Sequence, residues 1–105
     1  MYTRNVSMKL KADSIKEFTR MLESEVIPVL RKQKGFKDEI TLIAPERNDA
    51  VGISFWDRKE DAEAYNREKY QDVLKTLSKV LDGTPKVESF EVANSTSHQI
   101  AAKAA

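Results

Sequence analysis

Cysteine is absent from this 105-residue sequence, and histidine occurs once, as His98. The first absence excludes disulfides, thiolate nucleophiles and zinc sites built on sulfur. The single histidine excludes a metal or haem-copper centre with several histidine ligands from one chain. We therefore expect no metal site in this protein.

The chain also has no excess of positive or negative charge, and it has no long apolar run. Its 18 basic residues nearly cancel its 17 acidic ones, whereas nucleic-acid binding needs a patch of one sign. No apolar stretch approaches the roughly 20 residues of a membrane span. Residues 1–5 lack the apolar core of a signal peptide. We expect a soluble, cytoplasmic protein with neither a nucleic-acid nor a membrane partner.

The hydrophobic pattern alternates between the two periods of regular secondary structure. Val6, Met8 and Leu10 recur every second residue, which is typical of a half-buried strand. Apolar residues after Ser14, and again after Arg58, recur every three or four residues, as on a helix. The predicted order is strand, helix, strand, strand, helix, strand, with strands at residues 2–10, 36–44, 50–56 and 86–93.

Both predicted helices carry signals for their starts and for irregularities. Ser14 with Glu17, and Asp57 with Glu60, have the spacing of capping boxes. Pro28 predicts a kink in the first helix, because proline has no backbone N–H to donate. The apolar stripe of the second helix is weak at first and strong later, which predicts a break near residues 68–70.

This order predicts an α+β fold, a ferredoxin-like βαββαβ sandwich with a four-stranded antiparallel sheet and both helices on one face. Strands two and three form a hairpin, and we expect right-handed crossovers to place strands one and four inside. Residues 1–93 form the domain, and residues 94–105 a polar, alanine-rich tail. The uncovered sheet face keeps apolar residues, which predicts a homodimer formed sheet against sheet.

An aliphatic strand that ends in Trp56, followed by Asp57 and a helix rich in acidic residues and alanine, carries a family resemblance. Over residues 2–93 the chain resembles the antibiotic-biosynthesis-monooxygenase-like family of dimeric α+β barrels. That family holds cofactor-free oxygenases of anthrones and quinols, haem-degrading enzymes and small-molecule isomerases. The resemblance implies the same fold and a dimer, and it leaves the activity open.

The chain departs from the haem-degrading branch at the residues of that branch's haem site. That branch needs an Asn on the first strand, a Trp on the second helix and a later His on that helix. Val6, Tyr65 and Lys75 stand at these positions. A lysine protonated near its usual pKa of about 10.4 is a poor iron ligand. We expect no haem and no other cofactor.

The anthrone-oxygenase branch resembles the chain in part. Trp56 stands where that branch has its Trp, while Gly52 and Ala62 replace an Asn and a Tyr. The resemblance implies a cofactor-free oxygenation of a small planar phenol or quinol in an apolar pocket with a hydrogen-bond donor or base. The alternative is a non-catalytic dimeric module that binds a small apolar or aromatic ligand or a partner protein.

The role of Trp56, and that of the small residues beside it, can each be interpreted in two ways. Trp56 is either a plug of the core or dimer interface, or the flat wall of a ligand pocket. Gly52 and Ser54 share its strand face and are small, which leaves room for a ligand or for a closely packed helix.

Polar candidates lie on the second helix and in the tail. Tyr65 either donates a hydrogen bond to a phenolate oxygen or binds only backbone and water. Asn66 is either a second ligand-binding group or a solvent-facing residue. His98 has an unperturbed pKa near neutrality and is the candidate base if the tail folds back over the pocket; otherwise it is solvated.

Overall fold

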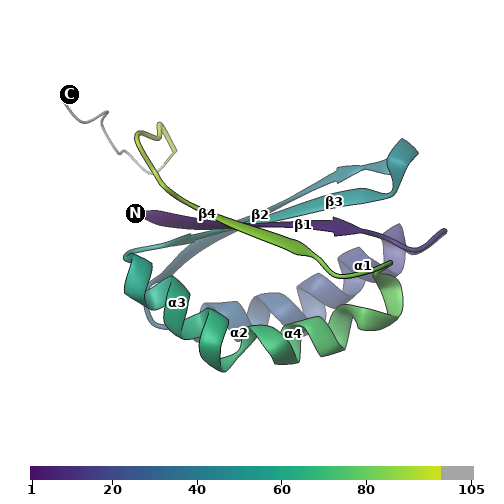
Figure 1. Ribbon diagram of the computed structural model, residues 1–105, viewed down its shortest axis with the longest axis horizontal. Coiled ribbons are helices and arrows are strands. Elements are labelled where there is room, and N and C mark those ends of the chain that lie inside the picture. The colour runs from purple at the N-terminus through teal and green to yellow at the C-terminus, as the bar shows by residue number, and fades with distance from the viewer. Residues whose placement is uncertain (98–105) are drawn as a thin grey trace.

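The computed structural model describes residues 1–97 as one antiparallel sheet with every helix on the same side of it (Figure 1). No helix in this part of the chain is long and apolar enough to cross a membrane. The strands are β1 (Tyr2–Lys9), β2 (Phe36–Ala44), β3 (Asp49–Trp56) and β4 (Lys86–Glu91). The helices are α1 (Ile15–Met21), the π-helix η1 (Leu22–Val26), α2 (Ile27–Arg31), α3 (Lys59–Glu68) and α4 (Tyr70–Leu77), with 3₁₀ turns η2 (Pro45–Arg47) and η3 (Ser78–Val80).

The strands are arranged in the order β2-β3-β1-β4. The ferredoxin-like fold is confirmed, but the prediction that the fourth strand lies inside is wrong. Each strand–helix–strand crossover passes over one neighbouring strand: from β1 to β2 over β3, and from β3 to β4 over β1. Val6 of β1 therefore lies opposite both Gly52 and Val87. The two central strands are β1 and β3.

Both predicted helix irregularities are confirmed. Pro28 lies in the first turn of α2, and the five residues before that helix form η1. Because proline cannot donate to the carbonyl four residues back, the hydrogen bonding here changes to the wider π turn. The second helix breaks at Lys69, whose φ of −128° separates α3 from α4.

The two predicted capping boxes are wrong, since neither helix start has a side-chain cap. Ser14 is the N-cap of α1, but its hydroxyl donates to the carbonyl of Ala12. Arg58, not Asp57, is the N-cap of α3. The Asp57 carboxylate instead forms an ion pair with Lys37 at 3.3 Å. In both places the side chain binds a partner outside the helix, which is local for Ser14 and on β2 for Asp57.

The two sheet faces differ in composition. The helix-covered face forms the core, and Trp56 belongs to it. On the other face Leu42 and Phe90 are each 52% exposed. Strand register places a continuous group of apolar side chains there, which we call the open-face patch: Ile40, Leu42, Val51, Ile53, Phe55 and Phe90.

Candidate functional site

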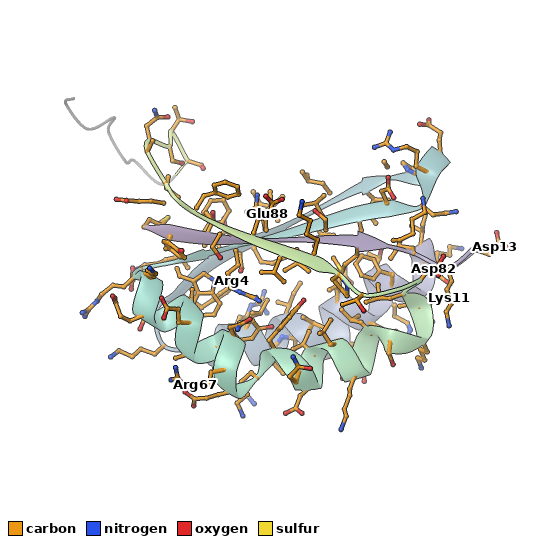
Figure 2. The ribbon with its side chains drawn as sticks, viewed as in Figure 1. Arg4, Lys11, Asp13, Arg67, Asp82 and Glu88 are labelled. Atoms are coloured by element: carbon orange, nitrogen blue, oxygen red, sulfur yellow. The ribbon has the colours of Figure 1, made fainter. Side chains whose placement is uncertain are left out.

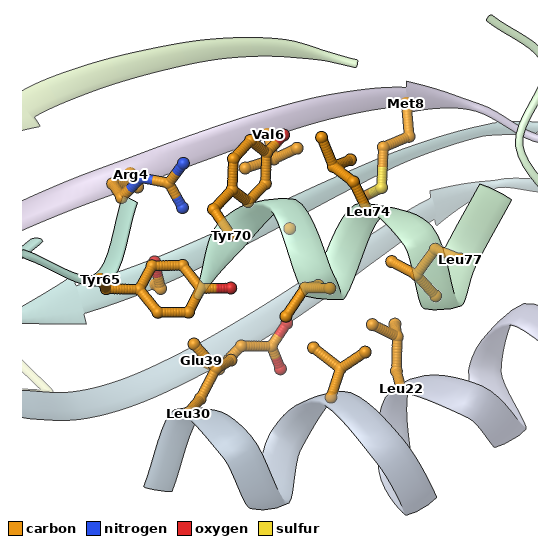
Figure 3. A pocket seen from close by; sticks show the side chains of 14 residues that line it. Arg4, Val6, Met8, Leu22, Leu30, Glu39, Tyr65, Tyr70, Leu74 and Leu77 are labelled. Carbon is orange, nitrogen blue, oxygen red and sulfur yellow. The ribbon is translucent and has the colours of Figure 1, made fainter. Parts of the chain in front are cut away.

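A cavity of about 60 Å³ lies between the helix-covered face of the sheet and the helices (Figure 3). Its wall is mostly aliphatic, with side chains from β1, η1, α2 and α4. The side chain of Met8 lies 3.6 Å from the point where a Cβ on Gly52 would sit, so glycine leaves this part of the wall open. The cavity has room for about four water molecules.

Tyr65 supplies a hydroxyl to the cavity from the last turn of α3. Its ring is only 3% exposed and packs against Trp56, with the ring centroids 5.2 Å apart. Figure 3 shows the hydroxyl directed into the cavity. Burial raises the pKa of Tyr65 to about 12, so the group stays protonated near neutral pH and acts as a hydrogen-bond donor.

Arg4 brings a buried cation to the cavity from the central strand β1. Its guanidinium lies over the rings of Tyr70, at 4.4 Å, and Tyr65, at 5.1 Å. It donates a hydrogen bond of 2.8 Å to Asn66 Oδ1. Desolvation lowers the pKa of Arg4 from its usual value. The sequence analysis missed this residue, although it shares strand parity with Val6.

Tyr70 opens α4 and lines the same cavity. Its hydroxyl oxygen is buried and has no hydrogen-bond partner within residues 1–97. Burial raises the pKa of Tyr70, and the nearby Arg4 acts in the opposite direction. A buried hydroxyl without a partner is uncommon, and here it lies beside a cation.

Glu39 is the carboxylate of the cavity and comes from the edge strand β2. Figure 3 shows it directed inward, and the hydroxyl of Thr41 donates to its Oε2. Desolvation raises the pKa of Glu39, while the Thr41 hydrogen bond lowers it. The sequence analysis missed Glu39 because Ile40 and Leu42, on the opposite face of β2, carry the stronger apolar signal.

Three of the predicted site residues meet at this cavity: Gly52, Ser54 and Tyr65. Trp56 does not line it. The indole is fully buried between Phe36 and Tyr65, and its Nε1 donates to Ser54 Oγ at 2.9 Å. This placement agrees with the core interpretation of Trp56, and it makes the indole the support behind Tyr65.

The other two predicted residues lie elsewhere. Asn66 borders a second hollow, where it accepts the hydrogen bond from Arg4. His98 falls outside the described residues. The cavity thus gathers Tyr65 with two charged side chains, Arg4 and Glu39, that the sequence analysis did not select.

Comparisons with known proteins identify the fold. No protein-family model and no curated protein matches the chain. Among solved structures, a monooxygenase from the gene ActVA-Orf6 of Streptomyces coelicolor, in complex with the ligand Nanaomycin D, superposes with a TM-score of 0.76 at 13% identity. That superposition covers 90% of this chain and 88% of the other.

Two further structures agree. The NE2512 protein of unknown function from Nitrosomonas europaea gives a TM-score of 0.75 at 14% identity, covering 90% of this chain and 91% of that one. An antibiotic biosynthesis monooxygenase gives 0.69 at 11% identity, covering 88% and 98%. At such identities the likeness concerns the fold alone. The chain therefore has the ferredoxin-like α+β fold of the antibiotic-biosynthesis-monooxygenase-like proteins, as the sequence predicts.

Proposed function

We propose that this protein is a cofactor-independent monooxygenase that acts on a small planar phenolic or quinol compound. One observation carries the proposal: a largely aliphatic cavity receives both the Tyr65 hydroxyl and the Glu39 carboxylate. An apolar, water-poor site strengthens the few polar interactions inside it. The fold shared with the Streptomyces coelicolor monooxygenase supports this reaction class by analogy.

Glu39 is the proposed base. The phenolic O–H bond breaks, the proton moves to the Glu39 carboxylate, and the electron pair stays on the substrate oxygen. A carboxyl whose pKa is raised by burial is a better proton acceptor than a solvated one. Tyr65 remains protonated and donates a hydrogen bond to the new oxyanion.

Dioxygen is the oxidant. The substrate anion transfers electrons to it directly, so the protein supplies no redox group. One oxygen atom enters the ring as a carbonyl, and the other leaves as water with two hydrogens of the substrate. A phenol thereby becomes a quinone, and all atoms and electrons balance.

The size of the cavity bears on the substrate. Room for about four water molecules suits a single aromatic ring after small side-chain shifts. A fused three-ring compound would displace the wall formed by Leu74 and Tyr70. In this proposal Gly52 and Ser54 form the floor, Trp56 supports Tyr65, and Asn66 holds Arg4. The role of His98 as a second base stays a prediction from the sequence.

The alternative is a module that binds a small ligand in the same cavity without turnover. Its support is the pair of small residues, Gly52 and Ala62, at positions where the oxygenase branch carries an Asn and a Tyr. Both hypotheses predict binding, and only the first predicts consumption of oxygen.

Oxygen uptake by the purified protein separates the two hypotheses. The substrates are monocyclic hydroquinones, reduced naphthoquinones and anthrones. We expect protein-dependent uptake, fastest with the single-ring compounds. Tyr65→Phe removes one oxyanion donor and should slow it about 10²–10³-fold, and Glu39→Gln should slow it roughly 10²–10⁴-fold. Tyr2→Phe, which changes a tyrosine outside the cavity, is the matched control. No uptake above the uncatalysed rate with any substrate would reject the enzyme hypothesis.

We also propose that two copies associate through the open-face patch. Leu42 and Phe90 expose about half of their surface there, and half-buried Ile53 and Phe55 lie between them. A contiguous apolar face on a small domain is a typical association surface. Asn5 lies on the same face, and its buried Oδ1 has no hydrogen-bond partner within residues 1–97. This oxygen could accept a hydrogen bond from the second copy.

A further inference from the structure

Arg4 is a buried cation that forms no ion pair within residues 1–97. The residue is 4% exposed, yet no ion pair joins its guanidinium to a carboxylate anywhere in residues 1–97. Figure 2 shows Arg4 between the sheet and the helices, whereas Arg67 of α3 points outward, where it pairs with Glu68. Arginines are rarely buried to this degree unless they are paired.

The neighbours of Arg4 compensate the charge only in part. Asn66 accepts one hydrogen bond, and the rings of Tyr65 and Tyr70 offer their π faces. Cation–π contacts stabilise a desolvated cation by less than the loss of its hydration destabilises it. The site therefore favours an anion placed against the guanidinium, where residues 1–97 put no paired carboxylate.

Space for such an anion exists beside the guanidinium. Arg4 lines both the 60 Å³ cavity and the second hollow under Asn66. Tyr70 also lines the cavity, and its buried hydroxyl has no partner in the described part of the chain. A cation and a buried hydroxyl beside it that border one cavity are the donors an oxyanion requires.

We propose that Arg4 and Tyr70 seat a ligand oxyanion, so that the cavity selects a phenolic or enolic compound in its anionic form. The inference rests on the proposed function for the class of ligand, and it concerns binding rather than turnover. Arg4 forms the charged hydrogen bonds, Tyr70 adds a neutral one, and the aliphatic wall encloses the ring.

The charge of the cavity distinguishes a phenol from a carboxylic acid. A phenol that enters neutral transfers its proton to Glu39, so the summed charge of Arg4, Glu39 and ligand stays the same. A carboxylate arrives already ionised and places a second negative charge near Glu39. The other titratable groups that face Arg4 are Tyr65 and Tyr70, in the cavity, and Tyr2 and Glu63, across the second hollow. This cavity therefore favours phenols over carboxylates.

The test uses 4-nitrophenol, whose anion and neutral form differ in colour, titrated spectroscopically in the presence of the full chain. We expect the bound probe to have a pKa at least one unit below that of the free probe, which is a tenfold preference for the anion. Arg4→Met should abolish the shift, Arg4→Lys should keep part of it, and Arg67→Met should match wild type. Circular dichroism checks that each variant is folded.

Several outcomes would overturn the inference. These are no binding of 4-nitrophenolate at millimolar concentration, an unchanged or raised pKa of the bound probe, and a folded Arg4→Met that keeps the shift. Benzoate that binds as tightly as the phenolate would show a general anion site and overturn the choice of ligand.

A second measurement needs no change at Arg4. Calorimetry in buffers of different ionisation enthalpy counts the protons released when neutral 4-nitrophenol binds. We expect no release from wild type, because Glu39 takes the proton, and about one proton from Glu39→Gln. Release of a full proton from wild type would contradict the role of Glu39. Anion-selective binding without any oxygen uptake would retain this inference and reject the oxygenase.

Discussion

At the scale of single residues, Glu39 is a carboxyl whose surroundings oppose its ionisation. Desolvation raises its pKa in the folded state above the value in the unfolded chain, so the folded protein binds the proton more tightly. The stabilisation from the protonated form is present at low pH and is lost as the pH rises through the raised pKa. At neutral pH the ionised Glu39 therefore lowers stability.

Glu39→Gln tests whether the ionised Glu39 lowers the stability of the protein at neutral pH. We expect the variant to unfold at a higher temperature than wild type at neutral pH, because the amide needs no desolvation of a charge. The two melting temperatures should converge below the ordinary glutamate pKa of about 4.3. Glu46→Gln, on an exposed turn, should change little at either pH. A Glu39→Gln protein that melts lower than wild type at pH 7 would contradict the account.

Strand alternation in the sequence predicts the core-side position of one charged cavity residue and not of the other. Arg4 could be placed on the core side from the sequence, because Val6 and Met8 fix the parity of that strand. Glu39 could not, because its neighbours of opposite parity, Ile40 and Leu42, are more apolar and belong to the open-face patch. A prediction that assigns the more apolar side of every strand to the core fails at β2, where that side belongs to the open face of the sheet.

At the scale of elements, Gly35 joins the end of the first helix to β2 under tight constraint. Its φ is +78°, its carbonyl accepts from the Asp57 N–H at 2.8 Å, and an added Cβ would lie 2.0 Å from Asp61 Oδ2. Gly83 has a similar φ of +85° with no atom within 4 Å of such a Cβ. Comparison of Gly35 with Gly83 therefore separates the effect of backbone strain from that of steric contact.

We expect Gly83→Ala to lower the free energy of unfolding by about 1 kcal/mol, from backbone strain alone. Gly35→Ala should lower it further, because Asp61 must also move, and Asp61→Ala in the same chain should recover that additional part. Urea unfolding monitored by Trp56 fluorescence measures all three differences. Equal effects of the two single substitutions would show that the contact with Asp61 is unimportant.

The elements themselves were predictable because their signals are local. Alternation along β1, the missing donor at Pro28 and the weak stripe before Tyr70 each act within a few residues. The capping box at Ser14 failed for a local reason, because its hydroxyl binds the carbonyl of Ala12, whereas Asp57 pairs with Lys37 of the strand β2. The order of the strands depends on which segments meet across the sheet, and no short window of sequence contains that information.

At the scale of the whole molecule, the open-face patch is the surface through which we propose that two copies associate. Leu42→Asp places a charge within the patch, on the edge strand β2, and should convert the proposed dimer into a monomer. Val87→Asp changes an apolar residue that is also exposed, 37%, but borders the second hollow, so this variant should remain dimeric. Light scattering at micromolar concentration gives both masses. A wild-type protein that is monomeric under these conditions would reject the proposed interface.

The arrangement β2-β3-β1-β4 also has a consequence for synthesis. Of the four strands, β1 is made first and becomes a central strand of the sheet. Both of its neighbours are made later, so Val6 can pair first with Gly52 and then with Val87. During translation β1 has two unpaired edges until β3 leaves the ribosome, and one until β4 follows. Such edges pair readily with other chains. A chaperone that shields the nascent amino-terminal strand would therefore raise the yield of this protein more than one that acts on the finished chain.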